Sequence, residues 1–277
     1  MNYILKGMTL TELQDFVIDH GYPKYRAQQI YNWMYKRLAT QAIDMYNLPL
    51  KLQSFLKNSC VLKTLELSKK NESNDTIKFL FKTKTNDYIE SVSMIEENRH
   101  TICISSQVGC SVDCDFCATG KMGFKKNLNV GEIIDQLLLI QNYVEAPITN
   151  IVFMGMGEPF LNYNNVITAS NLMNDKEGLN FSYHRITIST SGIAPKITQF
   201  INDKIKYNLA ISLNASDDKT RDKLMPINKK WPIKTLMQFT SKYNKLHKTG
   251  LTFEYVLIDS INDSDQDGRA LKVNQAK

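Results

Sequence analysis

Apolar residues in the first sixty positions recur at the spacing of an α-helix. Thr9-Leu10-Thr11-Glu12 is a capping-box sequence, and apolar residues then follow three or four positions apart until Gly21. The same spacing predicts a second helix over residues 25–38 and a third near residues 48–58, after Pro49. The chain therefore begins with a helical segment.

From residue 76 the apolar period changes to about two, which is typical of strands. Strands are predicted at 77–82, 88–94 and 101–105, with turns at 71–75 and 84–87. Farther on, helices are predicted at 130–143, 164–174, 195–203 and 234–248, and strands at 150–154, 185–190, 207–213 and 251–257. This alternation implies an α/β fold with a parallel sheet, as an open barrel or a doubly wound sheet, whose ligands bind at the carboxyl ends of the strands.

Composition narrows the class of protein. The chain has 277 residues, of which 43% are hydrophobic, so it can bury a substantial core. We find no apolar run long enough to span a membrane and no signal peptide, and we expect a cytoplasmic, reducing location. The net charge of +6 is compatible with an RNA partner. In the helix at 25–38, Arg26, Lys36 and Arg37 alternate with aromatic residues, a pattern that can bind nucleic acid or can form a core stripe with a solvated face.

Three closely spaced cysteines carry the strongest chemical signal. Cys110, Cys114 and Cys117 form a C-x3-C-x2-C sequence with no fourth cysteine close behind. A cubane iron–sulfur cluster usually has four protein ligands, so three cysteines leave one iron open. S-adenosylmethionine can chelate that iron through its amino and carboxylate groups, and reduction then yields a carbon radical. The spacing predicts a [4Fe-4S] cluster with S-adenosylmethionine.

Two other interpretations of these cysteines stay open at this point. A structural zinc site needs four ligands, and His100 or Cys103 would have to supply the fourth. Disulfides are disfavoured, because the chain has five cysteines and no secretory signal.

Polar and small residues follow three of the predicted parallel strands. They are Gly155-Met156-Gly157-Glu158-Pro159, Ser189-Thr190-Ser191-Gly192 and Ser212-Leu213-Asn214-Ala215. Taken singly, each serine or asparagine is more typical of a turn or a cap. Because all three groups follow successive strands beside the cysteine segment, together they indicate a ligand site.

These segments together resemble the RlmN family of radical S-adenosylmethionine RNA methyltransferases. The resemblance extends from about residue 8 to residue 265. It includes Ser105-Ser106-Gln107-Val108-Gly109 before the cysteines, Ala118-Thr119-Gly120 after them, the three strand-end groups, Met225-Pro226-Ile227-Asn228, and Tyr25-Arg26-Ala27-Gln28-Gln29-Ile30 near the start. It implies a partial, open βα barrel of the radical SAM type with an N-terminal helical accessory domain. The boundaries we expect are 1–65 for a helical, RNA-binding domain, 66–98 for a β linker and 99–277 for the radical SAM core.

The resemblance also implies an activity. Family members methylate C2 of an adenosine in 23S rRNA and, in some members, in tRNA, with electrons from a flavodoxin- or ferredoxin-type donor. One S-adenosylmethionine methylates a C-terminal cysteine. A second is cleaved at the cluster, and the resulting methylene radical adds to C2. The protein–RNA adduct is then resolved through a disulfide. We expect a monomer without a membrane partner.

Roles carry over by position. Cys110, Cys114 and Cys117 would bind the cluster, Cys103 would be the resolving cysteine, and Glu90 the proton acceptor. The S-adenosylmethionine contacts would be Glu158, Pro159, Ser189, Ser212, Leu213 and Asn214. Family members often have His where this chain has Asn214, but the Asn amide also offers a donor and an acceptor.

The end of the chain departs from the family pattern. Family members continue beyond this point and carry the methyl-bearing cysteine there, whereas no cysteine follows Cys117. We expect a C-terminally incomplete member that cleaves S-adenosylmethionine without completing methyl transfer. Two other functions remain: methylation of adenine C8 by the sister group, against which Pro159 argues, and an inactive iron–sulfur RNA-binding protein.

Overall fold

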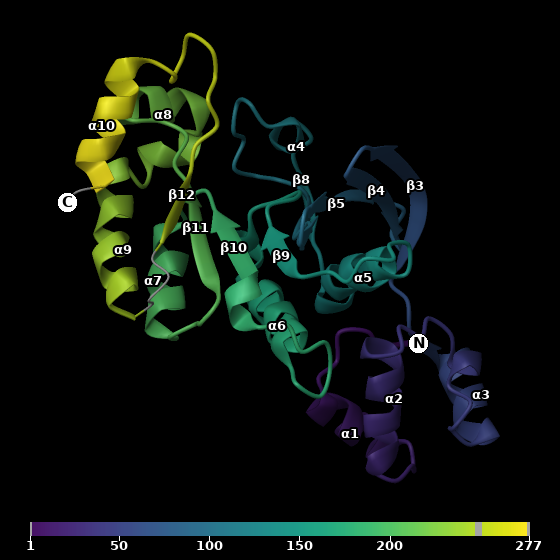
Figure 1. Ribbon diagram of the computed structural model, residues 1–277. Helices are drawn as coiled ribbons and strands as arrows, with labels where there is room; N and C mark the ends of the chain where they lie inside the picture. The colour runs from purple at the N-terminus through teal and green to yellow at the C-terminus, as the bar shows by residue number, and fades with distance from the viewer. Residues whose placement is uncertain (1, 247–250, 276–277) are drawn as a thin grey trace. The chain divides into compact units, whose positions relative to one another are not determined.

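The computed structural model describes residues 2–246 and 251–275, which form two compact units. Unit 1 comprises Met1–Ser105, Asn127–Ile151 and Asn164–Ser182. Unit 2 comprises Ser106–Lys126, Val152–Tyr163 and Tyr183–Lys277. Figure 1 labels the elements of both units. None of the described helices is both long enough and apolar enough to cross a membrane.

The predicted N-terminal helices of unit 1 are confirmed. They are α1 (Leu10–Asp19), α2 (Tyr25–Tyr35) and α3 (Leu50–Ser59), with a 3-10 turn η1 (Ala42–Asp44) between the last two. The predicted capping box is present, since Thr9 Oγ1 accepts from the Glu12 N–H and the Glu12 carboxylate accepts from the Thr9 N–H. The helix predicted over 25–38 is shorter than expected, because the chain leaves helical geometry before Leu38, where φ is +55°.

Unit 1 also contains an antiparallel meander. Its strands are β3 (Leu65–Ser73), β4 (Thr76–Thr83), β5 (Tyr88–Glu96) and β6 (Arg99–Cys103). The turn predicted at 71–75 is wrong in extent, because β3 continues to Ser73 and only Asn74 and Asp75 lie between the strands. β3 lacks apolar alternation and is mostly exposed, so its backbone pairing with β4 holds it in place. Two further strands, β1 (Tyr3–Ile4) and β2 (Cys60–Val61), pair in parallel.

The helix α5 (Val130–Gln141) packs on β3 and β4 within unit 1 and is buried from Gly131 to Ile140. Its Gln136 connects it to the sheet. The Gln136 Oε1 accepts from the Ser91 hydroxyl and from the Ser105 N–H, both at 2.7 Å, and its amide donates to the Ser105 carbonyl. These bonds fix the chain just before it enters unit 2. Unit 1 also holds nearly all of α6 (Tyr163–Asn174).

Unit 2 contains the parallel strands that the alternating pattern predicts. β10 (Ile186–Thr190), β11 (Asn208–Ser212) and β12 (Thr252–Glu254) pair in parallel, and Ser212 lies opposite Glu254. β9 (Asn150–Phe153) leads from unit 1 into unit 2. Shorter elements of unit 2 are β7 (Gln107–Gly109), α4 (Ala118–Lys121), the start of β8 (Phe124–Asn127) and the 3-10 turns η2 (Pro159–Asn162), η3 (Tyr183–Arg185) and η4 (Pro226–Lys229).

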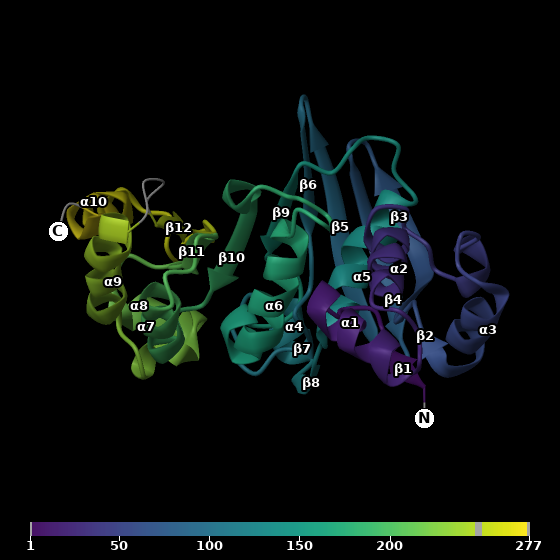
Figure 2. The ribbon, with the colours of Figure 1, turned by 90° about the horizontal axis from the view of Figure 1, so that it is seen from below.

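The helices of unit 2 are α7 (Ala194–Asn202), α8 (Asp218–Leu224), α9 (Ile233–Leu246) and α10 (Asp265–Gln275). Figure 2 shows α7 and α9 next to each other beside β11. Residues 247–248 of the helix predicted over 234–248 lie outside the described residues. The pattern did not predict α8 or α10, because short polar helices lack apolar periodicity.

Candidate active site

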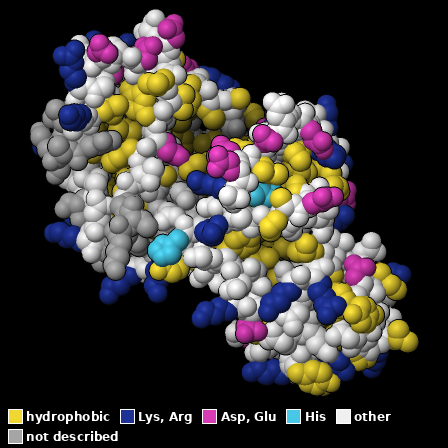
Figure 3. All heavy atoms as spheres, viewed as in Figure 1, with side chains coloured by type: hydrophobic (Ala, Val, Ile, Leu, Met, Phe, Trp, Pro, Cys, Tyr) yellow, Lys and Arg dark blue, Asp and Glu magenta, His cyan; other side chains and the backbone are white. Residues whose placement is uncertain are grey.

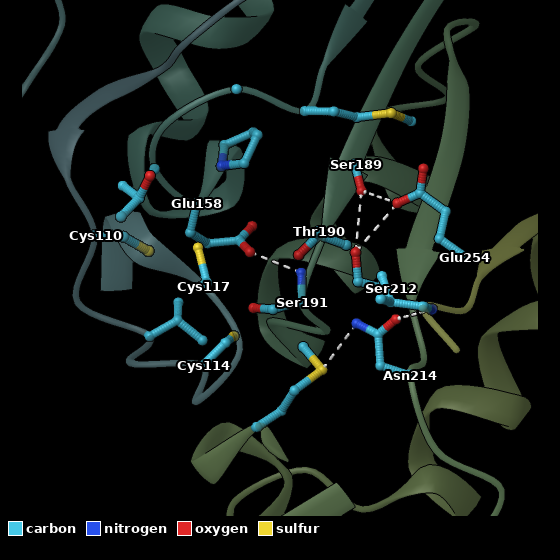
Figure 4. Close-up of a pocket in the computed structure, with 18 of the residues that line it drawn as sticks. Cys110, Cys114, Cys117, Glu158, Ser189, Thr190, Ser191, Ser212, Asn214 and Glu254 are labelled. Carbon is cyan, nitrogen blue, oxygen red and sulfur yellow. Dashed lines mark hydrogen bonds between the residues drawn. The ribbon is translucent and has the colours of Figure 1, made fainter. Parts of the chain in front are cut away.

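A pocket of about 390 Å³ lies within unit 2, at the carboxyl ends of its strands. That volume lies in the range of small-molecule sites. Its walls come from the cysteine segment, the loop after β9 and the ends of β10, β11 and β12 (Figure 4). Of the residues that the sequence predicted for cofactor and cluster binding, it brings together Cys110, Cys114, Cys117, Glu158, Pro159, Ser189, Ser212 and Asn214.

The three cysteines form one wall of the pocket, and each is a free, partly buried thiol. Backbone bonds fix the segment: the Cys110 N–H donates to the Gly123 carbonyl, and the Asp115 N–H donates to the Leu224 carbonyl. Burial raises the pKa of Cys114 to about 12, and the neighbouring Cys110 and Cys117 act in the same direction. Burial also raises the pKa of Cys110. Both shifts favour the neutral thiols of Cys110 and Cys114, and a bound cation would act in the opposite direction.

The separation of the thiols bears on what they can bind. Among residues 2–246 and 251–275, no three His, Cys, Asp or Glu side chains converge closely enough to hold a single metal ion. Thiolates that share one zinc ion each lie about 2.3 Å from it. In a cubane cluster each cysteine binds a different iron, so the ligands lie farther apart. Three cysteines on one pocket wall, with no fourth Cys or His among the described residues that line it, match the ligand set of a cluster with one open iron.

Glu158 connects the loop after β9 to the end of β10. Its carboxylate is buried and accepts from the N–H groups of Phe160 at 2.9 Å and Ser191 at 2.7 Å, while its own N–H donates to Gln107 Oε1 at 2.9 Å. Burial raises the pKa of this carboxyl, and the Ser191 N–H opposes that shift. Because both oxygens already accept backbone protons, Glu158 fixes the loop around the pocket.

Ser189 and Ser212 share a partner that sequence reasoning missed. Glu254, at the end of β12, accepts from the Ser189 hydroxyl at 2.7 Å and from the Ser212 hydroxyl at 3.1 Å, both through Oε2. The two hydroxyl oxygens lie 3.4 Å apart. The sequence did contain a sign of Glu254's role: it is a carboxylate within the mostly apolar string Thr-Phe-Glu-Tyr-Val, whereas buried parallel strands are normally continuous apolar runs.

Leu213 and Asn214 differ in how they meet the pocket. The Leu213 side chain is buried and does not line it, while its N–H donates to the Glu254 carbonyl. Asn214 lines the pocket with φ at +56°, a conformation that Asn adopts more readily than most residues. Its Oδ1 accepts from the Val256 N–H at 2.9 Å, and its amide nitrogen lies 3.4 Å from the Met225 sulfur. The amide thus holds the chain beyond β12.

Arg221 is a second residue that the sequence did not single out, because it lies in a polar string that looks like a solvated helix. It is fully buried. Its guanidinium donates to four acceptors: the carbonyls of Ser191, Ser212 and Leu213 and the side-chain oxygen of Asn228, at 2.7–3.0 Å. Burial lowers the pKa of Arg221 to about 10. Arg221 therefore ties the carboxyl ends of β10 and β11 together.

The two predicted catalytic residues, Glu90 and Cys103, lie in unit 1 and do not line the pocket. Glu90 is on β5, 2.9 Å from the ammonium of Lys78, and its side chain is about half exposed. Cys103 ends β6 opposite Val92. Cys60, in β2, is also a free thiol, and burial raises its pKa to about 12.

Comparisons with known proteins cover nearly the whole chain. Residues 104–268 match the radical SAM superfamily, and residues 3–62 match the ribosomal RNA large subunit methyltransferase N-terminal domain. The dual-specificity RNA methyltransferase RlmN of Geobacter sulfurreducens is 40% identical over 268 residues, which cover 96% of this chain and 74% of that protein. The probable RlmN of Aquifex aeolicus is 43% identical over 266 residues, covering 95% and 76%.

A solved structure is also similar. The crystal structure of a radical SAM methyltransferase from Sphaerobacter thermophilus superposes with a TM-score of 0.94 at 39% identity. The match covers 98% of this chain and 81% of that one.

Proposed function

The chain belongs to the RlmN family of radical SAM RNA methyltransferases, and we propose that its site serves methylation of C2 of an adenosine in 23S rRNA or tRNA, with a carrier cysteine that is not among the given residues after Cys117. The predicted radical SAM type of α/β fold is confirmed by the same likeness. The observation that carries the proposal is the pocket of unit 2, in which three cysteines face a row of hydroxyl and carboxylate groups.

Cys110, Cys114 and Cys117 would hold a [4Fe-4S] cluster. All three line one pocket, and no fourth Cys or His is among the described residues that line it, which supports this assignment. When bound, the cluster and S-adenosylmethionine together supply a carbon radical, which can attack an electron-poor ring carbon. The protein positions these groups.

Ser189, Ser212, Pro159 and Asn214 would contact S-adenosylmethionine, since all four line the pocket. Leu213 would contribute through its backbone, because its side chain is buried elsewhere. Glu158 would act by holding its loop in place. We retain Glu90 as proton acceptor and Cys103 as resolving cysteine, with its disulfide, as parts of the proposal. A flavodoxin- or ferredoxin-type donor, a reducing cytoplasmic compartment and a monomeric state also belong to it.

The distribution of charge in the N-terminal helices supports an RNA partner. Between Lys24 and Lys57 the chain carries six Lys or Arg residues and one acidic residue, Asp44, so this segment holds +5 of the net charge of +6. Figure 3 shows Lys and Arg side chains interspersed with hydrophobic ones over this part of the molecule. Such a concentration attracts the phosphate backbone of RNA.

Two cation–aromatic pairs are part of that charged segment. The Arg26 guanidinium lies 4.6 Å from the ring centre of Tyr25, and the Arg37 guanidinium lies 4.7 Å from that of Trp33. Arg37 also donates to the hydroxyl of Tyr46, whose side chain is 72% exposed. Trp33 is buried, whereas Tyr25 and Tyr46 are exposed beside these arginines, and exposed rings next to cations suit unpaired bases and their phosphates. We therefore propose that residues 1–65 form the RNA-binding domain, followed by the β linker at 66–98 and the radical SAM core from 99.

The test is anaerobic reconstitution of the 277-residue chain with iron and sulfide. The chain is then incubated with S-adenosylmethionine, a reductant and a 23S rRNA fragment or tRNA, and 5′-deoxyadenosine and 2-methyladenosine are quantified. Cleavage to 5′-deoxyadenosine supports the cluster and cofactor assignment, and 2-methyladenosine supports the full reaction. Cleavage alone supports the cluster and cofactor assignment but not methyl transfer by these 277 residues. Neither product, from a chain that has bound iron, contradicts the proposal, and 8-methyladenosine would assign the chain to the sister activity.

A further inference from the structure

We propose that helix α5, through its neighbouring residues Asp135 and Gln136, holds the RNA-binding helices in a fixed arrangement with the strands that carry Glu90 and Cys103. This inference rests on the proposed function, which gives the helices their RNA and the two strand residues their roles. It adds two positioning residues to that function. All the residues concerned belong to unit 1.

A buried ion pair joins α5 to the segment that precedes α1. The Lys6 ammonium lies 3.5 Å from the Asp135 carboxylate, and each side chain is 1% exposed. The same carboxylate accepts from the N–H and the hydroxyl of Thr64, which follows β2. Replacement of a buried ion pair by apolar residues is often neutral or stabilising, so the pair is weak evidence for a role in stability. The best-attested use of such a pair is to fix one arrangement of the elements that it joins.

The segment around Lys6 also contacts α2. Tyr35, at the end of α2, is buried, and its hydroxyl accepts from the Gly7 N–H at 3.0 Å. On the side of α5, a Cβ added at Gly7 would lie 2.5 Å from the Gly131 nitrogen, and one added at Gly131 would lie 2.5 Å from the Lys6 carbonyl oxygen. The backbones of this segment and of α5 are therefore in direct contact. The helix α2, with its two arginines, is thus held to α5 through this segment.

The next residue of α5 bonds to the strands of the meander. Gln136 Oε1 accepts from the Ser91 hydroxyl and from the Ser105 N–H, both at 2.7 Å. Ser91 follows Glu90 in β5, and Ser105 lies two residues after Cys103. The Ser105 hydroxyl in turn donates to the Glu90 carbonyl. One amide thus holds the backbone beside both residues.

Two adjacent side chains of one helix therefore bond to the two parts of unit 1 that would act on RNA. Adjacent residues point about 100° apart around a helix axis, so they reach different neighbours while sharing one stiff backbone. A displacement of about 1 Å between reacting groups can lower a rate about 100-fold. We expect loss of the ion pair to change where bound RNA lies relative to Cys103, and not how tightly the helices bind RNA.

The test variant combines Lys6→Met with Asp135→Asn. It removes both charges together, so that neither is left buried without its partner, and the Asn oxygen still accepts from Thr64. The matched control combines Lys70→Met with Glu72→Gln, which makes the same kinds of replacement at an exposed ion pair within β3.

The experiment measures disulfide trapping of bound RNA by Cys103. The probe is a 23S rRNA hairpin whose target adenosine carries a short pyridyl disulfide tether at C2. The Cys103 thiolate attacks this disulfide, forms a protein–RNA disulfide and releases pyridine-2-thione, which is quantified by its absorbance. The reconstituted chain is used at saturating RNA, and Cys103→Ala gives the background from other thiols. The affinity for a short single-stranded RNA and the melting temperature are measured on the same variants.

We expect the combined Lys6→Met and Asp135→Asn variant to lower the trapping rate by about 10- to 100-fold, the effect of a displaced reacting group. Its affinity for single-stranded RNA should equal that of the unaltered chain, and the control at Lys70 and Glu72 should keep both properties. A purely structural role would change the melting temperature and leave the trapping rate as it is. That result, or an equal loss of trapping in the control, overturns the inference.

A milder comparison applies if the double variant does not fold. Thr64→Val removes the hydroxyl that donates to Asp135, whereas Thr64→Ser keeps it. Trapping should be slower in Thr64→Val than in Thr64→Ser, and equal rates would overturn the inference. Trapping by the unaltered chain no faster than by Cys103→Ala would instead count against the role of Cys103 in the proposed function.

Discussion

Arg221 offers a test of how the strand ends around the pocket are held. Replacing it with Met keeps much of the side-chain volume but removes the donors to Ser191, Ser212, Leu213 and Asn228. Each bond to a charged group contributes about 1.5–3 kcal/mol, but the buried guanidinium also lost its hydration on folding. Removal of one partner from a buried charged network costs about 3–5 kcal/mol. We therefore expect Arg221→Met to lower the free energy of unfolding by about 3–5 kcal/mol.

The measurement is thermal denaturation followed by circular dichroism. For a chain of about this length 1 kcal/mol shifts the melting temperature by about 2–4 °C, so a loss of about 3–5 kcal/mol in Arg221→Met should lower it by about 6–20 °C. The melting temperature of Arg221→Lys should lie between those of Arg221→Met and the unaltered chain, because an ammonium cannot reach four acceptors arranged around a planar guanidinium. Arg269→Met, which removes an exposed arginine on α10, is the control and should melt with the unaltered chain. A melting temperature for Arg221→Met within about 2 °C of the unaltered chain would refute the reasoning.

Three further predictions concern the cysteines, the RNA surface and one glycine. Replacement of Cys117 by Ala should lower the iron bound after anaerobic reconstitution, whereas Cys60→Ala should not, as measured by elemental analysis; equal iron in both variants would count against the cysteine assignment. Replacement of Arg26 and Arg37 by Glu should make the dependence of the binding constant on salt less steep. For single-stranded RNA, the slope of log K against log salt should fall in magnitude by at least about 1.4, since each phosphate contact contributes about 0.7. Replacing the exposed Lys69 and Lys176 with Glu changes the net charge by the same amount. An equal reduction of the salt slope in that variant would refute an RNA-binding surface at Arg26 and Arg37. Gly157→Ala should weaken the binding of S-adenosylhomocysteine and destabilise the loop after β9 by about 1–3 kcal/mol. The reason is that φ at Gly157 is +96° and an added Cβ would lie 2.5 Å from the Cβ of Gln107. Gly21→Ala, at φ +77° with open space around it, should keep the unaltered affinity.

Local signals in the sequence were enough for the elements that depend on local interactions. The capping box of α1 and the turn near Asn86 could be predicted because the residues involved are neighbours in the chain. β3 could not, because its side chains are polar and its stability comes from pairing with β4. The site shows the same limit: the cysteine spacing is visible in the sequence, whereas Arg221 acts on carbonyls up to thirty residues away.

Glu254 was hidden for a related reason. Its partners Ser189 and Ser212 lie 65 and 42 residues away in the chain, and they meet it only because three parallel strands end at the same edge. A sequence pattern reports which residues follow a strand. It does not report which of them form hydrogen bonds with one another.

Two buried charged groups hold the backbone around the pocket, and only one of them, Glu158, lines it. Arg221 and Glu158 are buried and bond mostly to the backbone, one to carbonyls and the other to N–H groups, at the ends of β10 and β11 and in the loop after β9. The loops are thus fixed without using the hydroxyls of Ser189 and Ser212, which bond to Glu254 at the pocket edge. A site whose backbone is held before binding loses less conformational entropy when the ligand arrives. Loss of Arg221 should therefore weaken the binding of every ligand of the pocket alike.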